Sequence, residues 1–89
     1  MKLIEGMTVT ELGDSVFAVP TGPAANKYRG IIRLNETGGM IMNCLIEGLE
    51  VKQIAERILS EYENVTPETA EKAVQDIVDK LRSVGLIEE

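Results

Sequence analysis

The chain has 89 residues, and 15 acidic against 9 basic side chains give it a formal net charge of −6. This length suits one domain, residues 1–89, with a thin core and little room for a deep pocket. The sequence has no histidine, which removes the commonest general base and metal ligand, and its single cysteine excludes an intramolecular disulfide.

The first third of the chain predicts three short strands. Met7–Leu12 alternates loosely between apolar and polar residues, and Gly13-Asp14 is a two-residue hairpin sequence. Ser15–Val19 is the returning strand and is apolar on both faces. Residues 24–29 form a loop or a single helical turn, and residues 30–34 form a third strand. This third strand is either paired on both sides or lies at an open sheet edge, where it could pair with another chain.

Three helices are predicted after the strands. Asn35 is a strong N-cap for a helix over residues 36–47, in which Gly38-Gly39 lowers helix stability but permits a close approach. A second helix has an apolar stripe from Val51 to Tyr62. A third begins at Thr66-Pro67 and runs to about Val84. The order of elements predicts an α+β, winged helix-turn-helix-like fold, in which a three-stranded antiparallel sheet is followed by a three-helix bundle.

The charges are unevenly distributed along the chain. Residues 36–89 carry 5 basic and 12 acidic side chains, whereas residues 15–35 contain only Lys27, Arg29 and Arg33 as charged residues. The acidic helical part would repel phosphate backbones and anionic lipids. The three basic residues are either ordinary solvated charges or a group that steers an acidic peptide toward the protein by electrostatic attraction.

Other candidate sites favour structural interpretations. A DNA-reading helix needs Arg, Lys, Asn or Gln near its start, but the third helix begins with Glu68, Glu71, Lys72, Gln75 and Asp76. We therefore expect no nucleic-acid partner. The carboxylates lie on solvent faces rather than in a cleft, and Cys44 lies on an apolar stripe without an activating histidine. No enzyme activity, cofactor or metal is expected. No apolar run could cross a bilayer and no signal peptide is recognisable, so we expect a cytoplasmic protein with no membrane partner.

The sequence resembles the PqqD family, the coenzyme PQQ synthesis protein D type. The resemblance rests on "LNETG" at residues 34–38, Gly48 before the second helix, "IAERILSEY" at 54–62, Asp76, Leu81 and the closing "GLIE". The stretch from Pro20 to Gly30 is similar to short stand-alone members. Two positions depart from the family pattern: Gly39 replaces a better helix former, and Glu50 stands where Thr or Ser often caps a helix.

The resemblance implies a peptide chaperone, a recognition element for ribosomally made and later modified peptides. Such proteins hold the leader segment of a precursor and present the precursor to a modifying enzyme, often a radical S-adenosylmethionine (SAM) enzyme, as in PQQ biosynthesis. In the family the leader adds as a strand beside the third strand, against the third helix. The corresponding residues here are Gly30, Ile31, Ile32, Arg33, Leu34, Val74, Ile77, Val78, Leu81 and Arg82.

For the third helix we predict that Val78, Leu81 and Arg82 face the bound strand, while Ala70, Ile77 and Val84 lean toward the core. Two other functions remain open: a general protein-interaction adaptor of the same fold, and, less favoured, a DNA-binding regulator. The open strand edge could also pair two copies of the chain as a homodimer.

Overall fold

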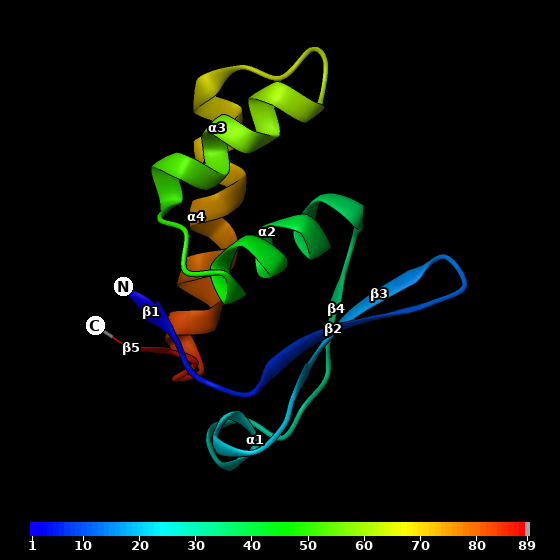
Figure 1. Cartoon of the computed structure of the whole chain (residues 1–89), viewed down its shortest axis with the longest axis vertical. Helices are drawn as coiled ribbons and strands as arrows, with labels where there is room; N and C mark the ends of the chain where they lie inside the picture. The colour runs from blue at the N-terminus through cyan, green and yellow to red at the C-terminus, as the bar shows by residue number, and fades with distance from the viewer. Residues whose placement is uncertain (89) are drawn as a thin grey trace.

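The computed structural model describes residues 1–88 and combines a small antiparallel sheet with three long helices and one short helix (Figure 1). The sheet has the order β2-β3-β4, formed by β2 (Met7–Leu12), β3 (Ser15–Pro20) and β4 (Ile32–Leu34). The helices α2 (Glu36–Ile46), α3 (Val51–Glu61) and α4 (Pro67–Ser83) follow in the chain. The predicted fold class is confirmed.

The β2–β3 hairpin turns at Gly13-Asp14, as the sequence predicts. Leu12 pairs with Ser15, and Gly13 adopts the left-handed conformation (φ 61°) that a two-residue turn requires. The five-residue helix α1 (Pro23–Lys27) then connects β3 to β4. Strand β4 covers only residues 32–34 of the predicted range 30–34.

Helix α2 lies across the sheet and is held close to it by Gly39. A Cβ atom at Gly39 would lie 2.8 Å from Cγ1 of Val16 on β3, so only glycine fits this contact. The helix begins at Asn35, whose side-chain oxygen accepts a hydrogen bond of 2.7 Å from the amide of Gly38. Both the predicted cap and the predicted close approach are therefore present.

The α3–α4 pair is also capped as its sequence suggests. The amide of Glu50 donates to Oε1 of Gln53 at 2.8 Å, so the unusual Glu50 still belongs to a cap. Asn64 has a φ of 60° after α3, and Oγ1 of Thr66 accepts from the amide of Thr69 at 3.2 Å at the start of α4.

The two ends of the described chain form a second small sheet that was not predicted. β1 (Lys2–Leu3) pairs antiparallel with β5 (Ile87–Glu88), and the amide of Ile4 donates to the carbonyl of Leu86 at 2.9 Å. Leu86 is fully buried in the core. The N- and C-terminal strands therefore lie side by side (Figure 1).

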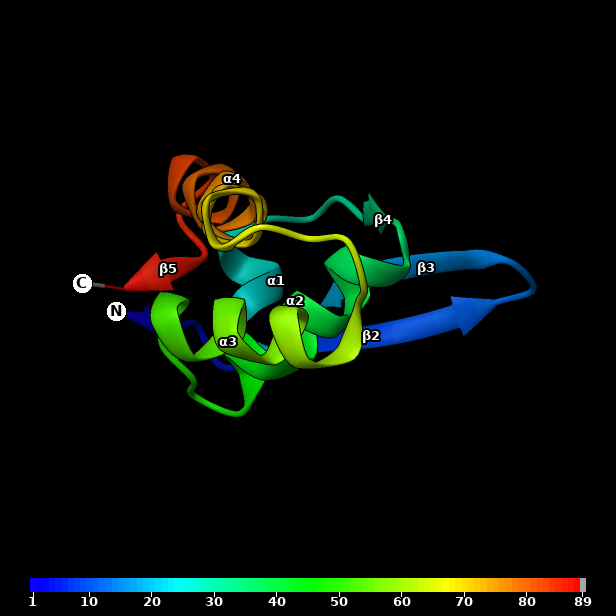
Figure 2. The ribbon, with the colours of Figure 1, turned by 90° about the horizontal axis from the view of Figure 1, so that it is seen from above.

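The core lies between the sheet and the helices and is built mainly from aliphatic side chains. Its largest fully buried side chains are Ile41, Met42, Cys44, Ile54, Val74, Val78, Leu81 and Leu86. Within residues 1–88, none of the helices is long and apolar enough to span a membrane. Figure 2 shows α4 and β4 on one side of α2, with α3 and β2 on the other.

Candidate functional site

Strand β4 is one of the two edges of the sheet, and β2 is the other. It pairs with β3 on one side, through Ala18↔Ile32, Phe17↔Arg33 and Val16↔Leu34, and the strand order leaves its other side unpaired. Unpaired amides and carbonyls at such an edge can accept a further strand from another chain. The choice that the sequence left open between an internal and an edge strand is therefore decided in favour of an edge.

The segment leading into β4 is shaped by the ring of Tyr28. A Cβ atom at Gly30 would lie 2.7 Å from the Tyr28 hydroxyl oxygen, so the ring occupies the space that a side chain would need. Ile31 follows and is 64% exposed, one of three large apolar residues that are exposed within residues 1–88. Exposed apolar surface thus lies directly beside the unpaired backbone.

Side chains alternate in burial along β4. Ile32 is buried and Leu34 is half-buried against the helices, whereas Arg33 between them is exposed. Arg33, Arg29 and Lys27 are all exposed, and none of the three takes part in an ion pair within residues 1–88. Their positive charges are therefore not neutralised by the protein itself.

The third predicted helix, α4, is rotated relative to the prediction. Val74, Val78 and Leu81 are at most 1% exposed, so these three predicted peptide contacts are core residues. Of the three residues that we expected to lean toward the core, Ala70 is buried as predicted, whereas Ile77 and Val84 are partly exposed and pack against the margin of the core. The predicted orientation is wrong because the apolar arc of α4 is wider than the buried stripe, and periodicity alone does not tell which part of it is buried.

Arg82 does not share a side of α4 with Ile77. Five residues at 100° per residue place the two side chains about 140° apart around the helix. Arg82 is exposed, and its Nη1 lies 3.4 Å from Oδ1 of Asp79. Of the predicted helix residues, Ile77 alone remains both apolar and accessible, and Ala73 is a half-buried neighbour one turn away that the predicted set did not include.

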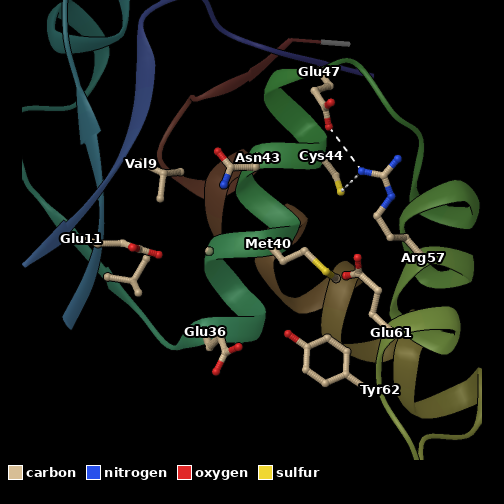
Figure 3. A pocket seen from close by; sticks show the side chains of 12 residues that line it. Val9, Glu11, Glu36, Met40, Asn43, Cys44, Glu47, Arg57, Glu61 and Tyr62 are labelled. Carbon is tan, nitrogen blue, oxygen red and sulfur yellow. Dashed lines mark hydrogen bonds and ion pairs between the residues drawn. The ribbon is translucent and has the colours of Figure 1, made fainter. Parts of the chain in front are cut away.

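A separate concavity lies on the α3 side of α2 (Figure 3). It has a volume of about 330 Å³ and contains four carboxylates, from Glu11, Glu36, Glu47 and Glu61. Arg57 contacts Oε2 of Glu47 at 3.5 Å and Sγ of Cys44 at 3.7 Å. The lining residues are Val9, Glu11, Val16, Glu36, Gly39, Met40, Asn43, Cys44, Glu47, Arg57, Glu61 and Tyr62.

Cys44 at this concavity is not set up as a nucleophile. Its side chain is 1% exposed, and burial raises the pKa of the thiol although the Arg57 guanidinium acts in the opposite direction. The buried packing role that the sequence predicts is consistent with this environment. Within residues 1–88, no group of three or more His, Cys, Asp or Glu side chains could hold a metal ion.

The start of α4 offers little to a nucleic acid. Its exposed side chains include Glu68, Glu71 and Asp76, and Nζ of Lys72 is paired with Oδ2 of Asp76 at 3.1 Å. A phosphate approaching this end of the helix would therefore meet net negative charge.

Comparisons with known proteins agree with this architecture. The family model for coenzyme PQQ synthesis protein D (PqqD) matches residues 23–87. A solved structure described as TbiB1 in complex with the TbiA(beta) leader peptide is 24% identical, with a TM-score of 0.74, over 99% of this chain and 95% of that one. A lasso peptide synthetase B1 complexed with the leader peptide is 22% identical, with a TM-score of 0.72, over 99% and 96% of the two chains. Comparison with curated protein sequences gives no match.

Proposed function

We propose that this chain, which belongs to the PqqD family, binds the leader segment of a ribosomally made precursor peptide as an additional strand along β4. The observation that carries the proposal is the unpaired edge of β4, with exposed Ile31 and the unneutralised Arg33 beside it. The two structures of similar fold, both described as leader-peptide complexes, support a leader peptide as the partner. The site needs no catalytic group, because recognition here comes from backbone pairing and side-chain contacts.

Helix α4 provides the second wall of the proposed site. Figure 2 looks down α4 from its N-terminus, and residues of a right-handed helix then advance clockwise. Seen along the axis of α4 in this view, β4 lies counter-clockwise of the core. Ala73, Ile77 and Val84 lie counter-clockwise of the buried stripe of α4, so they are on the flank that faces β4. We therefore replace Val74, Val78, Leu81 and Arg82 by these three half-buried residues as the contacts of the leader.

We propose that residues 1–89 form one domain, which acts as a non-catalytic partner of a modifying enzyme. Strands β2 and β3 precede the matched range 23–87, but they pair with each other and with β4, so they belong to the same unit. The bound precursor would be presented to a modifying enzyme, with a radical SAM enzyme as the first candidate. PQQ is one possible product class, because the family description names its synthesis. A general adaptor would use the same edge for a different protein segment.

Hydrogen exchange of the β4 amides tests the proposal directly. Random 12-residue peptides on a display library serve as the probe, and the enriched peptide is added to the protein. Amides alternate in direction along an antiparallel strand, so binding should slow exchange at Ile31 and Arg33, or at Ile32 and Leu34, but not at all four. Amides of α3 should not change. Peptide binding without alternate protection in β4 would contradict strand addition.

A further inference from the structure

The outward face of the sheet at β4 combines one basic and several apolar side chains. Phe17 pairs with Arg33, and both point away from the helices because their neighbours Ala18 and Ile32 are buried. Ile31 immediately precedes β4 and is exposed, and continuing the alternation of the strand by one residue places it on the same face as Arg33. A strand added to β4 would extend this face by one further column of side chains.

The positive charge of Arg33 has no acidic partner in the sheet. Its cross-strand neighbour on β3 is the apolar Phe17, and Glu36, the nearest charged residue in the sequence, forms no ion pair with Arg33 within residues 1–88. The first position at which a carboxylate could stand opposite Arg33 is therefore on the incoming strand. Directly opposed side chains in a sheet have Cβ atoms about 4.5–5.5 Å apart, close enough for a favourable opposite-charge pair and an unfavourable like-charge pair.

We propose that the leader strand carries an aspartate or glutamate opposite Arg33 and an aliphatic or aromatic residue opposite Ile31. This inference rests on the proposed function and specifies the peptide that the site selects. The intervening residue of the leader points to the helix side, where Ile77 and Ala73 favour an apolar side chain. The recognised segment is therefore acidic–apolar–apolar, with the first and third residues on the outward face.

The order of these residues follows from strand direction. All pairs within this sheet are antiparallel, and an antiparallel ladder is slightly more stable per residue than a parallel one. In an antiparallel addition, the residue opposite Ile31 lies two positions after the residue opposite Arg33. The acidic residue then precedes the outward apolar residue, whereas a parallel strand would place it two positions later.

The test uses peptide selection on the parent protein and on Arg33→Glu. The probe is a display library of 12-residue random peptides, and the matched control is Lys52→Glu, which changes the net charge equally at an exposed site on α3. Peptides enriched on the parent and on the control should share the acidic–apolar–apolar order. Peptides enriched on Arg33→Glu should carry Lys or Arg at the acidic position.

Calorimetry on one enriched peptide gives the size of the effect. Replacing its acidic residue by Gln should weaken binding to the parent by up to about fivefold, the upper end of the range expected for a cross-strand charge pair. Replacing the acidic residue of the peptide by Lys should weaken binding further. Arg33→Glu should recover the affinity that this Lys peptide loses. Thermal unfolding confirms that Arg33→Glu is folded, and Arg33→Gln provides a second variant that removes the charge without reversing it.

The outcomes separate this inference from the proposed function. If no peptide protects the β4 amides, the proposed function fails and the inference fails with it. If peptides protect β4 but show no acidic preference, or a preference that Arg33→Glu does not reverse, only the inference is overturned. Enrichment of the opposite order, apolar before acidic, would contradict the antiparallel direction.

Discussion

Single residues set how closely the helices approach the sheet. Gly39 was predicted from sequence as a weak point of the first long helix, and its cost in helix propensity is about 1 kcal/mol relative to alanine. The structure shows what the glycine provides, because α2 contacts Val16 of β3 at this position. Gly39, which departs from the family pattern, therefore fits the close packing of α2 against β3 in this chain.

Gly39→Ala should lower the stability of the protein. The added methyl group would meet Cγ1 of Val16 at 2.8 Å, and overpacking a close contact costs about 1–3 kcal/mol, more than the helix gains from alanine. Thermal unfolding should show a lower Tm. In a Val16→Ala background the same change should raise the Tm, because the obstructing methyl is gone. A higher Tm for Gly39→Ala in the parent would show that α2 shifts freely.

At the scale of elements, local signals predicted the main strands and helices but not all of their orientations. Asn35, Asn64 and Thr66-Pro67 mark helix ends by local hydrogen bonding and backbone preference, and the structure confirms each of them. The β1–β5 pair was missed because two-residue strands at Lys2–Leu3 and Ile87–Glu88 have no local pattern and depend on distant contacts.

In the candidate site, too, some features could be predicted from neighbouring residues, whereas others depend on packing between distant segments. The basic residues and a strand over residues 30–34, observed at Ile32–Leu34, were predicted from local sequence, as was the apolar character of Ser15–Val19 on both faces. The rotation of α4 could not be predicted, because the residues from Ala70 to Val84 form one wide apolar arc. Packing against α2 and α3 decides which part becomes core.

The revised orientation of α4 predicts opposite effects for neighbouring residues. Val78→Glu would place a charge at a fully buried position without a partner, so the protein should unfold or lose several kcal/mol of stability. Ile77→Glu replaces a partly exposed residue and should leave the fold intact. It should reduce the affinity for an enriched peptide about thirtyfold, as expected for loss of an anchor contact worth about 2 kcal/mol.

Circular dichroism and calorimetry on the same samples distinguish these effects. Leu59→Glu is the matched control, because Leu59 is half-buried on α3, on the other side of α2 from β4. This control should bind peptide normally if it remains folded. A folded Ile77→Glu protein with the affinity of the parent would remove α4 from the proposed site.

At the scale of the whole molecule, the charges are unevenly distributed: positive charge is concentrated in one segment although the net charge is negative. The protein carries a net −6, yet the segment that runs from α1 into β4 contains three basic residues, Lys27, Arg29 and Arg33, and none of the three is ion-paired within residues 1–88. The acidic side chains lie largely on the helices and around the concavity between β2 and α3. A peptide with acidic residues would therefore be attracted toward one side of the molecule and repelled from the other.

This separation of charge predicts a salt-dependent association rate. For an enriched acidic peptide, the on-rate to the parent should fall as ionic strength rises, because screening shortens the range of the attraction. Replacing Lys27, Arg29 and Arg33 together by Gln should lower the rate at low salt and flatten its salt dependence. The control replaces the exposed Lys2, Lys52 and Lys72 by Gln, which changes the net charge by the same amount outside the proposed site. Stopped-flow fluorescence with a labelled peptide measures the association rate and its salt dependence. Equal effects of the two triple variants would mean that net charge, and not the position of Lys27, Arg29 and Arg33, governs the encounter.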